Sequence, residues 1–261
     1  MQTNGQRHLL ILTCTVSPQV QSNLVRSNTE HRLQDYLTSI VHMQKYSQGM
    51  NIDFLIAENS KSVQLIHSGL IDLGLNLDNF TFYSCQQDSL SRISGISAGE
   101  HEMLREISGN FSFSSYEVIW KLTGRLSIEN LYQLISKSTG DFRANRFFTQ
   151  DHTIDSRFFG MTPNLFRVFA SNPPKYSEFS QGDAGFRDHE IFRAIEFYLA
   201  FYALSLESKG FSVRGLPGIP LYRGISASTG KSLDGLQTRL KVKALNRFRG
   251  LFIKGLLGVG P

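Results

Sequence analysis

A short run of charged, hydroxyl and glycine residues follows an apolar segment near the middle of the chain. The apolar segment is Tyr116–Trp120, and residues 121–125 then read Lys-Leu-Thr-Gly-Arg. An arginine offers a planar fork of N–H donors to phosphate oxygens, a lysine offers a point charge, and a glycine lets the backbone approach a ligand closely. A helix expected from Ile128 onward would add the positive end of its dipole. These residues predict an anion site; a plain strand–turn–helix connection with solvated cations is the alternative.

A second pair of charges lies in the segment Thr153–Phe159, which reads as a strand and carries Asp155 and Arg157. The pair has two interpretations of equal weight. One is a local ion pair, which on a surface contributes about 0–1 kcal/mol; the other is a contact to a bound ligand. Asp155 also lies near Asp151 and His152, but two carboxylates and one histidine in a loop are common, so we predict no metal site.

Alternating strands and helices are expected to position these groups. Apolar, β-branched runs predict strands, and apolar residues at helical spacing predict helices. The predicted elements are strands over 8–16, 51–60, 80–85 and 116–120, a helix over 28–46 capped by Asn28 or Thr29, and a helix that starts after Gly95 and Gly99. This order is typical of an α/β unit with a mainly parallel sheet. Polar segments follow three of the strands, at 15–19, 58–61 and 121–125, so we expect them to meet at the carboxyl edge of the sheet, where ligands bind.

The second half of the chain is less regular. The sequence predicts a short helix ended by Pro173 and Pro174, a long aromatic helix over 188–210, and then a loop-like stretch rich in Gly, Pro and Ser. Residues 1–235 are interpreted as one α/β domain and residues 236–261 as a basic C-terminal tail.

The order of these parts resembles the nucleotide-sugar-dependent glycosyltransferases of the GT-A fold, in particular bacterial enzymes of capsule and lipopolysaccharide assembly. The resemblance covers about residues 8–230 and implies a Rossmann-like, mainly parallel central sheet flanked by helices. It also implies that the loop after the first strand holds the nucleotide and that the end of the second strand lies near its base. The donor-binding residues implied in these two segments are Thr15, Ser17, Glu58, Asn59 and Ser60. Under the same resemblance, the ligand that Asp155 and Arg157 would contact is the donor or acceptor sugar.

The chain departs from this family after the fourth strand. In the family that strand ends in an Asp-x-Asp motif, which binds a divalent metal and through it the diphosphate; here it ends in Lys-Leu-Thr-Gly-Arg. A fixed cation stabilises the charge of a leaving phosphate as a metal does. We therefore expect Lys121, Thr123, Gly124 and Arg125 to hold the donor phosphates without a cofactor, with Mg²⁺ or Mn²⁺ as the alternative.

Two acidic residues, Asp188 and Glu190, open the predicted long helix. In the resembling enzymes an acidic residue at a helix start in this region deprotonates the acceptor hydroxyl as a general base. The resemblance therefore implies that Asp188 or Glu190 is the catalytic base, without distinguishing between them. The alternative is that both only stabilise the positive N-terminus of the helix.

The C-terminal tail combines cations with apolar residues and has no acid between residues 239 and 254. Its cations are Arg239, Lys241, Lys243, Arg247, Arg249 and Lys254. The pattern suits an amphipathic helix on an anionic membrane surface, and a docked helix with a solvated basic face is the alternative. We expect no nucleic-acid partner, because the basic excess is confined to this segment and no known nucleic-acid motif is present.

The amino-acid composition excludes several other classes of protein. The 261 residues are 41% hydrophobic and 19% charged, so a folded core is expected and global disorder is excluded. Cys14 and Cys85 are the only cysteines, which argues against a disulfide framework or a zinc site. No apolar run reaches the roughly 18–20 residues that span a bilayer, and His8–Val16 reads as a buried strand rather than a signal peptide. The sequence thus predicts a cytoplasmic protein, with peripheral attachment to the inner membrane face as a further hypothesis.

Two functions from different classes are consistent with these observations. The first is a hexosyltransferase-like enzyme that moves a sugar from a nucleotide-sugar donor to a cell-envelope polysaccharide or lipid-linked acceptor. The second is a non-catalytic α/β protein that binds a nucleotide or a glycan and has kept the fold without the metal.

Overall fold

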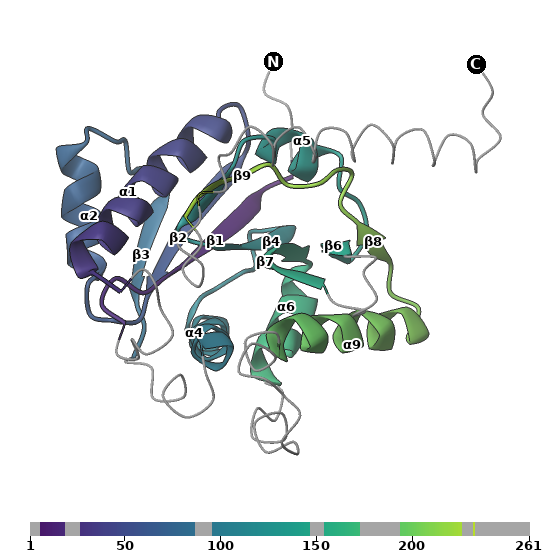
Figure 1. Cartoon of the computed structure of the whole chain (residues 1–261). Coiled ribbons are helices and arrows are strands. Elements are labelled where there is room, and N and C mark those ends of the chain that lie inside the picture. The colour runs from purple at the N-terminus through teal and green to yellow at the C-terminus, as the bar shows by residue number, and fades with distance from the viewer. Residues whose placement is uncertain are drawn as a thin grey trace.

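A seven-stranded sheet forms the centre of the described part of the chain, in the order β3-β2-β1-β4-β7-β6-β8 (Figure 1). The structure, a computed structural model, describes residues 6–18, 27–86, 96–146, 154–172, 194–225 and 232. The strands are β1 His8–Cys14, β2 Ile52–Glu58, β3 Phe80–Ser84, β4 Val118–Thr123, β6 Phe142–Arg146, β7 Ile154–Met161 and β8 Val213–Gly215. Strands β3, β2, β1 and β4 are parallel, whereas β7 runs antiparallel to both of its neighbours. The predicted mainly parallel α/β sheet is confirmed.

Helices cover both faces of this sheet, so its central strands are buried on two sides (Figure 1). One layer consists of α1 Thr29–Tyr46, α2 Val63–Asp72 and α5 Leu131–Ser136, and the other of α4 Ile96–Asn110, α6 Pro163–Ser171 and α9 Ala194–Ser208. Side chains along a strand alternate between faces. In β1, Leu10 and Leu12 accordingly pack with the α1 layer and Leu9 and Ile11 with the α4 layer. This alternation decides which layer each polar residue at the strand ends joins.

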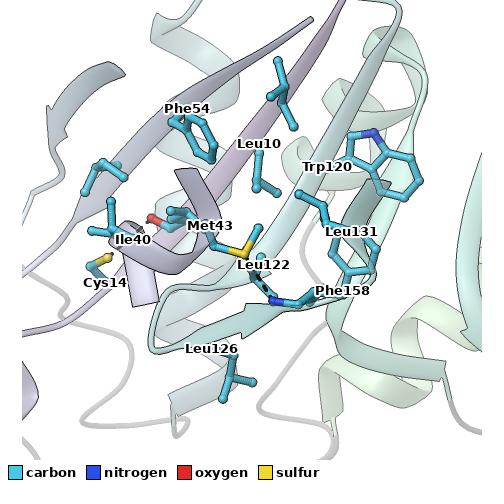
Figure 2. Packing of buried hydrophobic residues seen from close by; sticks show 14 of the residues in the cluster. Leu10, Cys14, Ile40, Met43, Phe54, Trp120, Leu122, Leu126, Leu131 and Phe158 are labelled. Atoms are coloured by element: carbon cyan, nitrogen blue, oxygen red, sulfur yellow. Dashed lines mark hydrogen bonds between the residues drawn. The ribbon is translucent and has the colours of Figure 1, made fainter. Parts of the chain in front are cut away.

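The α1 layer is packed around large side chains of the central strands (Figure 2). Trp120 of β4 stacks on Phe158 of β7 with ring centroids 5.0 Å apart, and Ile40 and Met43 of α1 lie over Leu10. The start of α1 agrees with the predicted cap, since the Asn28 side chain accepts a hydrogen bond from the backbone N–H of His31 at 2.9 Å. The capping interaction and the packing of Ile40 and Met43 thus hold the described start and body of α1 against the sheet.

Three predictions about elements need correction. The predicted helix start at Ile128 is wrong: Ile128 ends strand β5, Leu126–Ile128, which pairs with β9, Tyr222–Gly224, and α5 begins only at Leu131. Lys121 and Thr123 belong to β4 rather than to a turn after it. The stretch expected to be loop-like contains β8 and β9, and helix α2 was not predicted.

Several predicted features lie outside the described residues. They are the acidic pair Asp188 and Glu190, the option of a metal at Asp151 and His152, and the tail 236–261 with Arg239, Lys241, Lys243, Arg247, Arg249 and Lys254. Of the predicted helix 188–210, the structure describes α9, Ala194–Ser208. No helix in the described ranges combines the length and hydropathy of a membrane span.

Candidate functional site

Two loops interlock at the carboxyl edge of the sheet, after β1 and after β2. The Thr15 hydroxyl donates to the Asn59 side-chain oxygen at 2.7 Å, and the Ser17 backbone N–H donates to the Ser60 hydroxyl at 2.9 Å. The structure therefore brings together four of the residues predicted to hold the donor nucleotide. Their contact with a nucleotide stays a prediction.

Glu58 supports these loops from inside the protein. Its side chain is fully buried, and its Oε1 accepts from the backbone N–H of Val16 at 3.1 Å and of Ser60 at 3.0 Å, and from the Ser60 hydroxyl. Its Oε2 accepts from the backbone N–H of Ser62 at 2.7 Å. A carboxylate that accepts several backbone N–H groups holds a loop in one conformation. The geometry thus assigns Glu58 to positioning Val16 and Ser60.

Two buried guanidinium groups lie near the β1–α1 loop. Arg32 is 4% exposed and donates to the backbone carbonyl of Thr15, through Nε at 2.8 Å, and to the Tyr36 hydroxyl. Arg125 is 7% exposed, and its Nε and Nη1 have no hydrogen-bond partner within the part of the chain that the structure describes. Burial raises the pKa of Tyr36, and the charges of Arg32 and then Arg125 act in the opposite direction. Both cations are therefore close enough to act on the same phenol.

The same two cations affect the pKa of the Cys14 thiol. Burial raises its pKa, with the Glu58 carboxylate as the next cause, while Arg125 and Arg32 act to lower it. An unpartnered buried charge such as Arg125 costs free energy unless another group satisfies it. The site thus contains a cation that an anionic ligand would stabilise.

The turn that carries Arg125 depends on a glycine. Gly124 joins β4 to β5, and its N–H donates to the Thr13 carbonyl at 3.0 Å. A Cβ atom at Gly124 would lie 2.7 Å from Cys14 Sγ and 2.7 Å from the Thr13 carbonyl oxygen. Only glycine lets the turn close against β1 in this way.

The side chain of Arg125 also lines a pocket of about 150 Å³ between α1 and β9. The other lining residues are Asp35, Thr38, Ser39, His42, Ser127, Arg223, Gly224 and Ile225. Arg125 therefore lies on the α1 side of the sheet.

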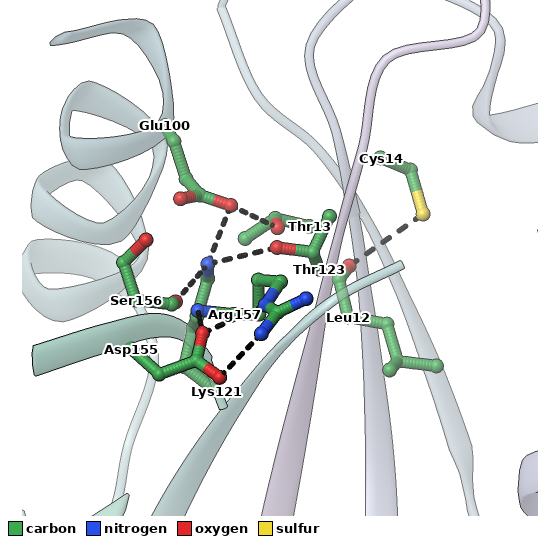
Figure 3. A network of polar contacts seen from close by, with 9 residues as sticks. All are labelled: Leu12, Thr13, Cys14, Glu100, Lys121, Thr123, Asp155, Ser156 and Arg157. Atoms are coloured by element: carbon green, nitrogen blue, oxygen red, sulfur yellow. Dashed lines mark hydrogen bonds and ion pairs between the residues drawn. The ribbon is translucent and has the colours of Figure 1, made fainter. Parts of the chain in front are cut away.

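Lys121 lies on the opposite side, in a polar network under α4 (Figure 3). Its side chain is fully buried, and its Nζ lies 2.7 Å from Glu100 Oε1, 2.8 Å from the Ser156 carbonyl oxygen and 3.2 Å from the Thr123 hydroxyl. An ammonium has three N–H donors, and these three contacts use them all. The sequence treats residues 121–125 as one anion-binding unit. The structure divides it, with Lys121 in a network internal to the protein and Arg125 beside the β1–α1 loop.

Asp155 and Arg157 form the local ion pair that was one of their two interpretations. Arg157 Nε lies 2.8 Å from Asp155 Oδ1, and its Nη2 donates to Oδ2 at 2.8 Å. Tyr222 donates its hydroxyl to Asp155 Oδ2 at 3.0 Å, and the Arg157 guanidinium lies 4.3 Å from the centre of the Tyr222 ring. The Asp155 carboxylate is fully buried, whereas the Arg157 side chain is 38% exposed. Contact of Arg157 with a sugar stays a prediction.

The sequence did not single out Thr13, Arg32, Tyr36 or Tyr222, and it did not indicate that Glu100 would pair with Lys121. Thr13 had a usable signal, since it is a hydroxyl in an otherwise apolar strand that precedes the predicted nucleotide loop. The others depend on packing between elements far apart in the chain. Glu100 meets Lys121 only because α4 crosses the end of β4.

Comparisons with known proteins bear on the fold. No protein-family model matches the sequence, and no curated protein matches it. Among solved structures, the galactosyltransferase LgtC in complex with donor and acceptor sugar analogues is similar with a TM-score of 0.50 at 8% identity, over 72% of this chain and 70% of that chain. The S. cerevisiae mannosyltransferase Ktr4p in complex with GDP gives a TM-score of 0.40 at 12% identity, over 84% of this chain and 71% of that chain. This chain has a GT-A-like fold.

The residues at the strand end do not suit the metal that this fold commonly holds. The segment at the end of β4, Lys121 to Arg125, where the resemblance implies an Asp-x-Asp motif, contains no carboxylate and ends in Arg125. A guanidinium carries only N–H donors and a positive charge, so it repels a divalent cation instead of coordinating it. Nowhere in the described ranges do three His, Cys, Asp or Glu side chains converge as a metal site requires.

Proposed function

We propose that this protein transfers a sugar from a nucleotide-sugar donor to an acceptor hydroxyl, and that the guanidinium of Arg125 takes the place of a metal at the donor phosphates. The observation that carries the proposal is Arg125, a buried guanidinium with unpartnered Nε and Nη1 at the turn after β4. Both nitrogens are enclosed within the described structure, so a phosphate reaches them only after a local shift of this turn; it would then supply the missing acceptors through charge-assisted hydrogen bonds. The GT-A-like fold and the interlocked loops at Thr15 and Ser60 support the same conclusion.

The proposed reaction breaks the bond between the anomeric carbon of the sugar and a phosphate oxygen, and forms a bond from that carbon to the acceptor oxygen. The leaving phosphate gains negative charge, which Arg125 stabilises electrostatically. The acceptor hydroxyl gives its proton to a general base, for which Asp188 and Glu190 are the predicted candidates. The donor sugar is proposed to be a hexose.

The proposed acceptor is a cell-envelope polysaccharide or a lipid-linked glycan at the inner face of the membrane. The basic tail supports this part of the proposal, because its six cations, from Arg239 to Lys254, have no acid between them and would attract an anionic surface. The protein would then be cytoplasmic and attached peripherally.

A nucleotide screen tests the proposal. Thermal unfolding is measured with UDP, GDP, CMP and their sugar conjugates, each with EDTA and with added Mg²⁺ or Mn²⁺. A ligand at 100 times its dissociation constant stabilises the folded state by about 2.7 kcal/mol. We expect one nucleotide series to raise the unfolding temperature equally under both conditions. Stabilisation only with added metal would overturn the metal-free donor site, and no stabilisation in any series would overturn the donor site itself.

A transfer assay separates the enzyme from the alternative, a non-catalytic nucleotide- or glycan-binding protein. The stabilising nucleotide sugar is incubated with the protein, and release of free nucleotide is followed with and without glycan acceptors. Release that rises with protein concentration supports the transferase, whereas binding without release supports the alternative.

A further inference from the structure

We propose that Glu100 binds the transferred sugar: its free carboxylate oxygen accepts a hydrogen bond from a sugar hydroxyl, while Lys121 and Thr13 hold the carboxylate in place. This inference rests on the proposed function and names the residue that recognises the sugar part of the donor.

The two oxygens of Glu100 have different surroundings (Figure 3). Oε1 accepts from the Thr13 hydroxyl at 2.6 Å and lies 2.7 Å from Lys121 Nζ. Oε2 has no hydrogen bond to any residue in the described ranges, is not among the enclosed polar atoms there, and points away from Lys121 in Figure 3. The side chain is 17% exposed. Glu100 therefore presents one fixed, accessible acceptor.

Hydrogen bonds through Thr13 connect this acceptor to the turn that carries the proposed phosphate site. Thr13 bonds Glu100 through its hydroxyl, and its backbone carbonyl accepts from the N–H of Gly124 in the turn that carries Arg125. In a nucleotide sugar, the sugar is attached directly to the terminal phosphate. A donor whose phosphate contacts this turn therefore has its sugar within reach of the neighbouring strand ends and of α4.

Other carboxylates at this edge of the described structure are already occupied. Both oxygens of Glu58 accept backbone N–H groups, and both oxygens of Asp155 are bonded, to Arg157 and Tyr222. Glu100 also lies on a helix, which holds a binding group more rigidly than a loop does. These differences single out Glu100 as the carboxylate available to a sugar.

The chemistry of the group limits the sugar class. A carboxylate accepts hydrogen bonds from hydroxyls and repels other carboxylates. A neutral hydroxylated sugar fits this position, whereas a uronic acid that places its carboxylate at Oε2 does not. Lys121 acts as a positioning residue, because it occupies Oε1 and leaves Oε2 as the acceptor.

The test compares binding of nucleotides with and without the sugar. Calorimetric titrations use UDP with UDP-glucose, UDP-galactose and UDP-N-acetylglucosamine, and GDP with GDP-mannose, on the wild-type full chain, Glu100→Gln and the control Glu106→Gln. Glu106 lies on the same helix but bonds Tyr83 and the N–H of Gln86. We expect wild type to bind one nucleotide sugar more tightly than its nucleotide. In Glu100→Gln, the ratio of the affinity for the nucleotide sugar to the affinity for the nucleotide should fall about tenfold or more, while the affinity for the nucleotide itself is unchanged. In Glu106→Gln, this ratio should equal the wild-type ratio.

A second variant controls for misfolding caused by the loss of a buried counter-charge. Glu100→Gln leaves the Lys121 ammonium buried without its counter-charge, so Glu100→Gln/Lys121→Met removes both charges. We expect this double variant to bind the nucleotide as wild type does and to show the same loss of the sugar contribution. If either folded variant keeps the full sugar contribution, or if wild type gains nothing from the sugar in any pair, the role of Glu100 is overturned. Failure of wild type to bind any nucleotide overturns the proposed function instead.

Discussion

The ammonium of Lys121 lies 2.7 Å from a carboxylate oxygen of Glu100, and the Lys121 side chain has no exposed surface. The pair therefore neutralises one of the two cations in the Lys-Leu-Thr-Gly-Arg stretch within the protein itself. Arg125 lies only four residues later, and its Nε and Nη1 atoms have no hydrogen-bond partner among the described residues. The stretch is thus divided: Lys121 is paired within the protein, and Arg125 is the cation that we propose contacts the donor phosphates.

Lys121→Met is expected to destabilise the fold by about 3 kcal/mol, because it leaves a mostly buried carboxylate at Glu100 without its counter-charge. Urea unfolding at pH 7 measures the change. The double variant Lys121→Met/Glu100→Gln removes both charges and should recover more than half of the loss. A single variant as stable as wild type would show that the ion pair does not support the fold.

Gly124→Ala is expected to cost about 1–3 kcal/mol, because the added methyl group meets a backbone carbonyl that cannot yield easily. Its Cβ would lie 2.7 Å from both the Thr13 carbonyl oxygen and Cys14 Sγ. Gly109→Ala in α4 is the matched control, since no atom lies within 4 Å of its Cβ position. That change should stabilise the helix by about 0.5–1 kcal/mol. Equal unfolding free energies for the two variants would contradict the close approach at Gly124.

Local sequence patterns were sufficient to predict the strands and helix ends that form through short-range interactions. The fully buried β1 follows from its continuous apolar run, and the start of α1 follows from Asn28, whose side chain bonds the His31 N–H. Helix α2 had a readable signal in Val63, Ile66 and Leu70, which share its buried face.

The features that the sequence did not predict depend on contacts between residues far apart in the chain. Ile128 belongs to a strand of only three residues, which forms because Tyr222, 94 positions later, pairs with it. The same limit applies to the site: the sequence predicts Lys121 as a phosphate-binding cation, but its burial depends on Glu100 from α4 and the Ser156 carbonyl from β7. Spacing along the chain does not contain that information.

The stability of the fold is expected to fall in mild acid because of His8. Burial, followed by the charge of Arg143, lowers its pKa from 6.5 to about 4, and its Nδ1 accepts from the Trp120 indole N–H at 3.4 Å. Above pH 6.5 neither state is protonated, so the full stability is present. Between pH 6.5 and 4 the unfolded chain binds a proton that the folded chain does not, so stability falls. From pH 7 to 5 the loss from this residue is about 2 kcal/mol.

Unfolding by urea at pH 7 and pH 5 checks this expectation on wild type and His8→Gln, whose amide oxygen can still accept the Trp120 N–H. The pH-dependent loss should be smaller in the variant by about 2 kcal/mol. His101, whose pKa burial also lowers to about 4, contributes to both proteins and cancels in the comparison. The same loss in both proteins would rule out His8 as a source.

The tail is expected to bind anionic vesicles. Each Lys or Arg near such a surface contributes about 1 kcal/mol, so replacing the six cations from Arg239 to Lys254 by Gln should abolish co-sedimentation with phosphatidylserine vesicles. Neutral phosphatidylcholine vesicles are the control surface. Equal binding of both proteins to the anionic vesicles would place the membrane contact elsewhere or exclude it.

Arg125→Ala is expected to weaken binding of the nucleotide found in the screen by about 1.5–3 kcal/mol, the range for a hydrogen bond to a charged group. The unliganded variant should be no less stable than wild type, because the change removes a buried charge whose Nε and Nη1 have no partner. Arg105→Ala is the control: that side chain is 54% exposed and lies 3.7 Å from Glu102 on the surface of α4, so nucleotide affinity should not change. Calorimetry and urea unfolding together decide the role. A loss of stability with unchanged nucleotide affinity would show that Arg125 is a structural residue, and it would contradict the proposed role of Arg125 at the donor phosphates.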